Sequence, residues 1–260
     1  ISDFLLNVVF GSITAEVEGY ARTYLLIVSA SIPFIALYNA GAALFRIMGN
    51  SRVSMLVALL MNGINVGGNA LLVFGFHLGV AGVAIPTLVS RIVAAAVILG
   101  LLCSAKHEIH FERDMSLRPD WNMIRNIMSV GIPNGVENSL FQLGKILMLS
   151  LISSFGTASI AANAIANNFA QYQILGGMSV GIAMVTVVSQ CVGAGDYEKG
   201  RRYTRKLMKL SYLFIVIMVV VTLALMPLIL RLYNVSAEAD AYAVRCILLH
   251  GGMACLIWPM

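Results

Sequence analysis

The sequence predicts an all-α protein that crosses a membrane many times. Of its 260 residues, 59% are hydrophobic and 11% are charged, whereas soluble domains carry about 25% charged residues. The apolar residues gather in runs close to the roughly 20 residues that a membrane-spanning helix needs. The basic residues fall in short clusters between these runs, as they do in the cytoplasmic loops of membrane proteins.

The apolar runs define the expected helices. In chain order they are the tail of a helix at 1–11, full spans at 23–46, 53–75, 80–103, 126–154, 158–192 and 207–232, and the start of another at 240–260. The run 158–192 is too long for one straight span, so we expect a bend at Gly176 and Gly177 or a helix that leaves the bilayer. Because Ile1 and Met260 both lie in apolar runs, we expect an internal fragment of a longer protein.

The basic residues separate the connecting segments into two sets. The segments 46–52, 104–125 and 193–209 contain these twelve: Arg46, Arg52, Lys106, Arg113, Arg118, Arg125, Lys199, Arg201, Arg202, Arg205, Lys206 and Lys209. The alternate segments contain Arg22, with Arg231 at a border. The positive-inside rule therefore predicts that the first set is cytoplasmic. It also explains the net charge of +5 without an anionic partner, so we expect no nucleic acid binding.

The longest polar segment, 104–125, predicts a division into two bundles. We expect residues 1–103 to end an N-terminal lobe, 104–125 to be a cytoplasmic linker and 126–260 to begin a C-terminal lobe. Many transporters are built from repeated bundles with the substrate site between them.

Several stretches resemble one transporter family. PFIALYNAGAALFRIMGN (33–50), NGINVGGNALLVFGFHLGVAGVAIPTLVSR (62–91), GIPNGVE (131–137), SQCVGAGD (189–196) and CLIWPM (255–260) are similar, in order and spacing, to segments of the multidrug and toxic compound extrusion (MATE) family. The resemblance implies a fragment from the end of helix three to the start of helix ten of a twelve-helix, two-lobe bundle around a central cavity.

Glu137 is the candidate for coupling transport to an ion. If its helix starts near residue 126, it lies about 16 Å along the helix, near the bilayer centre. An ionisable residue at that depth is a functional candidate, and a carboxyl group can bind a proton or a sodium ion. The alternative is a structural bond to Lys145, through intermediates, or to another helix. MATE transporters of one type carry an acid two turns after the proline that starts this helix. Glu137 lies only one turn after Pro133, and Phe141 occupies the place of that acid.

Polar side chains in the two segments after the linker are candidates for the wall of a substrate cavity. They are Asn138, Gln142, Lys145, Asn163, Asn167 and Gln171. Asn163, Asn167 and Gln171 are four residues apart, so they share one helix face. The alternative for the amides is hydrogen bonding between helices. Lys145 can instead pair with an acid of another helix or extend to the membrane surface.

Four further residues are structural or hinge candidates. Pro33, Pro133 and Pro227 lie in or at the start of apolar helices, where proline permits bending or gives a static kink. Arg91 lies in the middle of an apolar run, and we expect it to bond polar groups of neighbouring helices.

These features predict a secondary active exporter and not an enzyme. The resemblance implies export of organic, often cationic, compounds in exchange for H⁺ or Na⁺ by alternating access of two lobes, in a monomer of the inner cell membrane with no other cofactor. A flippase for lipid-linked sugars of the same superfamily is the alternative. We expect no catalytic residues and no metal site, and the pattern Gly177-Met-Ser179-Val-Gly181 lies in an apolar helix, where small residues four apart favour helix packing. A channel would need a pore-lining repeat, which is absent.

Overall fold

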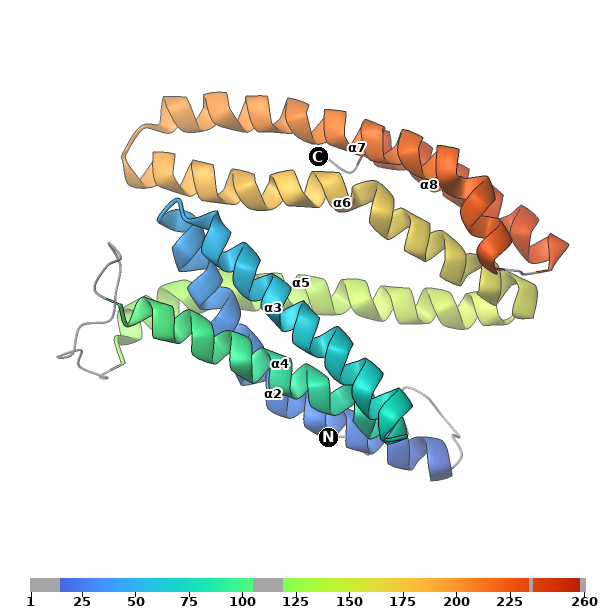
Figure 1. The fold of residues 1–260 in the computed structure, drawn as a ribbon. Coiled ribbons are helices and arrows are strands. Elements are labelled where there is room, and N and C mark those ends of the chain that lie inside the picture. The colour runs from blue at the N-terminus through green and yellow to red at the C-terminus, as the bar shows by residue number, and fades with distance from the viewer. Residues whose placement is uncertain (1–14, 105–118, 234–235, 258–260) are drawn as a thin grey trace. The chain divides into compact units, whose positions relative to one another are not determined.

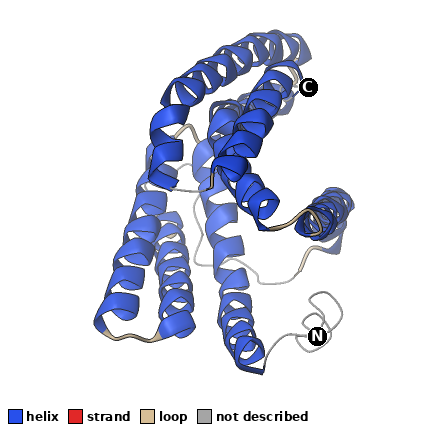
Figure 2. Ribbon diagram, turned by 90° about the vertical axis from the view of Figure 1, so that its right-hand side faces the viewer, coloured by secondary structure: helices blue, strands red, loops and turns tan. Residues whose placement is uncertain are grey.

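The structure, a computed structural model, describes residues 15–104, 119–233 and 236–257. These residues form seven α-helices and one π-helical turn, with no strand among them (Figure 2). The expected helix tail at 1–11, most of the segment 104–125 and the last residues of CLIWPM lie outside the described residues.

The chain divides into two compact units, Ile1–Ser116 and Leu117–Met260. The first contains α2 (Ala15–Ile47), α3 (Ser51–Ala70), the π-helical turn η1 (Leu71–Gly75) and α4 (Gly79–Leu102). Helix α4 packs against both α2 and α3. The core between them is made of apolar side chains from all three helices, namely Tyr38, Ala42, Phe45, Val57, Ala94, Ile98 and Leu102.

The second unit contains α5 (Trp121–Ser153), α6 (Thr157–Gly193), α7 (Tyr197–Tyr233) and α8 (Ala237–Ile257), labelled in Figure 1. Helix α6 contacts each of the other three. Its buried side chains Ala162, Ile165 and Phe169 pack against α7 and α8. Helix α5 contacts α6 alone among the described elements of this unit, and its side chains are exposed along almost the whole length.

Five helical segments are long and apolar enough to cross a membrane, among the described residues: Glu18–Ile47, Ser51–Gly75, Gly79–Leu102, Thr157–Gly193 and Tyr197–Arg231. The expected spans 126–154 and 240–260 are also helical, as α5 and α8, but are not among the five. Helix α5 contains Glu137, Lys145 and several amide side chains, and α8 begins with acidic residues. Neither therefore contains a stretch as long, as apolar and as poor in charge as those of the five.

Several helices begin earlier than hydropathy predicts. Helix α7 begins at Tyr197 and not at 207, and α2 begins at Ala15 and not at 23. The basic residues 199–209 are thus on a helix and not in a loop. Hydropathy detects only the part of a helix inside the hydrocarbon, which is about 30 Å thick, whereas the 37 residues of α7 extend for about 55 Å. Helix α6 is likewise one unbroken helix, and its length exceeds the hydrocarbon thickness.

The start of α5 also corrects an expectation. The helix begins at Trp121, so residues 121–125 belong to it and not to the linker, and Pro133 lies inside it and not at its start. Asp120 explains this start, because its carboxylate accepts hydrogen bonds from the backbone N–H groups of Asn122 (2.9 Å) and Met123 (3.2 Å). Such an N-cap satisfies donors that the first turn of a helix leaves free.

Helix α6 ends at a glycine with a left-handed backbone. Gly195 has φ of 72°. Its N–H donates to the carbonyl of Val192 (3.0 Å), and the N–H of Asp196 donates to the carbonyl of Cys191 (3.0 Å). This pair of bonds is the Schellman motif, which favours glycine because a side chain at positive φ is strained. Gly49 ends α2 with φ of 77°, so two of the stretches quoted for the family resemblance are helix-ending signals.

Gly195→Ala is expected to destabilise the protein by about 1–2 kcal/mol, the cost of a non-glycine residue in the left-handed region. A Cβ atom at Gly195 would meet nothing within 4 Å, so strain alone causes the loss. Gly193→Ala is the control, since Gly193 is the last residue of the helix and also has open space around it. Thermal unfolding of the purified protein measures both, and equal midpoints would contradict the assignment.

Candidate functional site

A groove between α5 and α6 collects most of the polar side chains that the sequence nominates. It encloses about 330 Å³ and is lined by Gln142, Lys145, Ile146, Met148, Leu149, Ile152, Asn163, Asn167 and Gln171. Five of the six substrate-cavity candidates therefore lie together, although they come from two helices. The groove combines amides and one ammonium group with aliphatic side chains, which is the mixture found in binding sites for small organic molecules.

The helix geometry of α6 explains its side of the groove. Asn163, Asn167 and Gln171 follow one another at four-residue spacing and line the groove. The opposite face of the same turns carries Ile165 and Phe169, which are buried against α7 and α8. Burial of the apolar face thus orients the amide row away from the core and towards α5.

Asn138 is the one cavity candidate that does not line the groove. It lies about one turn before Gln142 on a similar face of α5. Its side-chain amide donates to the backbone carbonyl of Asn134 (2.9 Å) and to the side-chain oxygen of Asn134 (2.6 Å). Asparagine side chains often bond to the preceding helical turn in this way, so the Asn138 amide is occupied within its own helix.

Lys145 provides the charge in the groove. Its ammonium nitrogen lies 4.8 Å from the centre of the Phe141 ring, one turn earlier on α5. This is a cation–π contact, which is stronger where water is excluded. Phe141 occupies the position at which the resemblance would place an acid, so an aromatic face holds the lysine there.

Glu137 is the middle residue of α5, about 24 Å from either end. Its side chain is exposed and does not line the groove. The eight residues between Glu137 and Lys145 amount to a rotation of about 80° around the helix, so the two side chains point to different sides. Within the described residues the structure gives Glu137 no ion pair, the pair present being Asp196 with Lys199.

The structural and hinge candidates all lie inside helices. Pro33, Pro133 and Pro227 are interior residues of α2, α5 and α7. Figure 1 shows α7 curving towards its C-terminal end, the part that contains Pro227. Arg91 of α4 donates a hydrogen bond to the hydroxyl of Ser31 on α2 (2.5 Å), and Ser31 is fully buried.

A buried polar pair in the second unit is not apparent from the sequence. Gln173 of α6 is fully buried, and its side-chain oxygen lies 2.8 Å from Nδ1 of His250 on α8. The amide nitrogen of Gln173 has no hydrogen-bond partner among the described residues. The 77 positions that separate these residues in the chain give no local signal that they meet.

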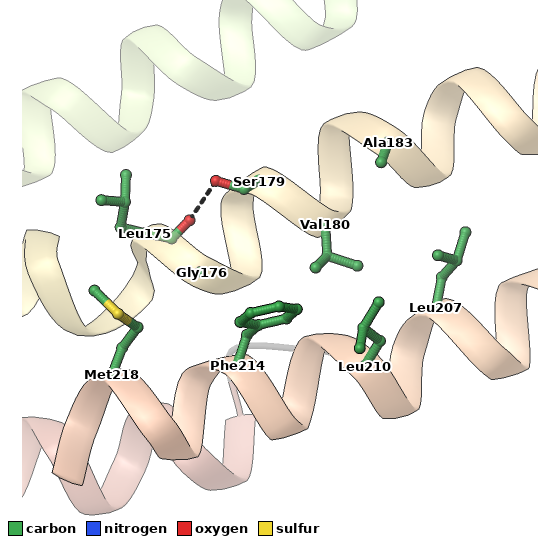
Figure 3. A pocket seen from close by; sticks show the side chains of 9 residues that line it. All are labelled: Leu175, Gly176, Ser179, Val180, Ala183, Leu207, Leu210, Phe214 and Met218. Atoms are coloured by element: carbon green, nitrogen blue, oxygen red, sulfur yellow. Dashed lines mark hydrogen bonds between the residues drawn. The ribbon is translucent and has the colours of Figure 1, made fainter. Parts of the chain in front are cut away.

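A second groove, between α6 and α7, is almost wholly apolar (Figure 3). It encloses about 360 Å³ and is lined by Leu175, Gly176, Ser179, Val180, Ala183, Leu207, Leu210, Phe214 and Met218. The hydroxyl of Ser179 donates to the carbonyl of Leu175 (2.9 Å) and is therefore satisfied within α6. Gly177 lies against Ile215 and Ser211 of α7, so that glycine of the G-x-S-x-G pattern serves helix packing. A Cβ atom at Gly181 would meet nothing within 4 Å.

Comparison with a family model gives a direct match. Residues 133–253 match the model named MatE. This stretch contains most of α5, all of α6 and α7, and most of α8. The groove between α5 and α6 lies wholly within it.

Curated relatives extend the similarity to most of the chain. The chain is 27% identical over 218 residues to the "Probable multidrug resistance protein NorM" of Thermotoga maritima, which covers 82% of this chain and 46% of the relative. It is 25% identical over 235 residues to the "Probable multidrug resistance protein YoeA" of Bacillus subtilis, covering 88% of this chain and 51% of the relative. The chain thus spans about half the length of these relatives.

The fold is that of solved MATE transporters. The structure titled as the outward-facing conformation of a multidrug resistance MATE family transporter superposes with a TM-score of 0.85 at 20% sequence identity, covering 95% of this chain and 55% of that one. The similar structures, the family match and the curated relatives all point to a helical membrane protein, as do the apolar helices of membrane-spanning length. The chain is therefore similar to MATE transporters in sequence over residues 133–253 and in fold over most of its length, and it contains helices long and apolar enough to cross a membrane.

Proposed function

We propose that the protein exports organic, often cationic, compounds in exchange for H⁺ or Na⁺. The observation that carries the proposal is the polar groove between α5 and α6 in a chain with five apolar segments of membrane-spanning length among its described residues. The names of the relatives, which describe multidrug resistance proteins, support the class of substrate. A monomer embedded in the bilayer is the form that we expect to act.

The groove is suited to compounds that are partly apolar. Ile146, Met148, Leu149 and Ile152 offer aliphatic contact, and the three amides of α6 can each donate and accept hydrogen bonds. A few polar groups in an apolar wall fix the orientation of a ligand without demanding one particular shape. Methionine adapts to different partners, which favours a broad range of substrates.

Transport follows if ion and substrate favour different orientations of the protein. A ligand shifts a two-state equilibrium only by its difference in affinity for the two states. We assign the ion to Glu137, because a carboxylate in the middle of a long membrane helix binds a proton or a sodium ion more readily than the amides around it. Pro133, one turn before Glu137, and Pro227 in α7 are the positions at which we expect the helices to bend.

A flippase for a lipid-linked sugar is the second candidate, and one observation favours it. Lys145 lines the groove, whereas Glu137 does not. The charge of the groove is therefore positive, which suits a phosphate group better than an organic cation.

Export of a fluorescent organic cation from cells that express the complete gene tests the proposal. We expect faster efflux than in cells without the gene, and efflux that stops when the proton and sodium gradients are collapsed. Removing one gradient at a time identifies the coupling ion. Unchanged cation efflux, together with movement of a fluorescent lipid-linked phosphate across vesicle membranes, would contradict the exporter and support the flippase.

A further inference from the structure

The first four turns of α7 carry a dense cluster of positive charge. Arg201, Arg202, Arg205, Lys206 and Lys209, here called the basic face, are all exposed. With Glu198 they line a hollow of about 400 Å³. None of the five is ion-paired with a described acidic residue, and the neighbouring Lys199 is the partner of Asp196 at 2.8 Å.

The five cations share one side of the helix. At 100° per residue they occupy a sector of about 140°. Leu207 and Leu210 lie outside this sector and line the apolar groove with α6 (Figure 3). The positive-inside rule requires only that the basic residues lie on the cytoplasmic side, and it does not require them to share one face of the helix. Their restriction to the side away from α6 gathers the five positive charges on one exposed surface, which attracts anions.

The same side of α7 becomes aliphatic one turn later. Leu213, Val216, Ile217 and Val220 continue the line of the basic face and are 55%, 43%, 45% and 59% exposed. Because α7 is about 55 Å long and the hydrocarbon is about 30 Å thick, part of the helix must project beyond the membrane core. The change from cations to aliphatic side chains after Lys209 marks the boundary.

We propose that the basic face of α7 binds the phosphate headgroups of anionic phospholipids, whose acyl chains lie along the aliphatic stripe below it. A phospholipid has both parts in this order, whereas free phosphate or a soluble nucleotide would leave the stripe unused. Each arginine or lysine side chain near an anionic membrane surface strengthens the binding of a protein to that surface about fivefold. The site is independent of the groove between α5 and α6, so it holds whether or not the protein is an exporter.

Reconstituted full-length protein tests the lipid site. The protein is placed in nanodiscs that contain phosphatidylcholine and phosphatidylglycerol. Native mass spectrometry of the protein released from them then gives the ratio of the two lipids that remain bound to it. We expect the wild type to be enriched in phosphatidylglycerol. The triple variant Arg201→Gln/Arg205→Gln/Lys209→Gln is expected to lose most of that enrichment, and high salt should weaken the enrichment in the wild type without any substitution.

A matched control separates the basic face from total charge. Arg22→Gln/Arg52→Gln/Arg125→Gln removes three exposed charges elsewhere and is expected to keep the enrichment. Equal enrichment in the wild type and the first triple variant would overturn the proposal. It would also be overturned if soluble glycerol phosphate abolished the enrichment at a concentration equal to that of the lipid, because the acyl chains would then contribute nothing.

Discussion

Glu137→Gln is expected to reduce export by about 5–150-fold, the range typical of the coupling between two ligands. Glutamine keeps the size of the side chain, but its neutral amide can neither take up a proton nor balance the charge of a sodium ion. The ion could then no longer bias the orientation of the protein. Efflux of a fluorescent organic cation from cells expressing equal amounts of wild type and variant measures the effect.

Two controls define what the Glu137 result means. Glu137→Asp retains the carboxyl group and should preserve part of the export. Glu198→Gln removes an exposed acid at the start of α7 and should leave export unchanged. Wild-type efflux by Glu137→Gln would exclude this residue as the coupling site. The Gln173–His250 pair would then be the next described position to examine.

Gly68→Ala is expected to destabilise the protein by about 1–3 kcal/mol, the usual cost of overpacking. A Cβ atom there would lie 2.7 Å from Cβ and 3.0 Å from Cγ of Pro86 on α4. The proline ring is rigid and Pro86 is buried, so it cannot move aside as a flexible side chain would. The thermal unfolding midpoint of the purified protein in detergent should fall.

The adjacent glycine provides the control for Gly68. A Cβ atom at Gly67 would meet nothing within 4 Å. Alanine is favoured over glycine inside a helix by about 1 kcal/mol, so Gly67→Ala should leave the midpoint unchanged or raise it. Equal unfolding midpoints for Gly68→Ala and Gly67→Ala would contradict the close contact between α3 and α4 at Gly68.

Hydropathy predicts the fold well because the bilayer acts on every residue of a span. An apolar run of sufficient length must be a helix there, since its backbone polar groups have no water to bond. Hydropathy does not detect the start of α7 at Tyr197, because residues 197–206 precede the apolar run and their polar composition is compatible with either a loop or a helix. The start of α5 depends on one side chain, Asp120, whose capping bonds the hydropathy pattern does not register.

The groove could be predicted in part. Periodicity places Asn163, Asn167 and Gln171 on one face, and membrane helices turn such faces inward. Two features could not be inferred. Asn138 bonds back to Asn134, a local competition that the sequence pattern leaves open. The contact between Gln173 and His250 depends on how α6 and α8 pack, which a single sequence does not reveal.

The affinity of the purified full-length protein for a compound that it exports tests the central claim, that the groove between α5 and α6 binds the substrate. Asn167 lines the groove, whereas Asn168 points elsewhere and donates a hydrogen bond to the hydroxyl of Tyr233 (3.3 Å). Loss of one hydrogen bond to a buried ligand raises the dissociation constant about tenfold. We predict that Asn167→Leu weakens binding about tenfold, while Asn168→Leu leaves it unchanged. Equal affinities of the two variants would contradict the claim.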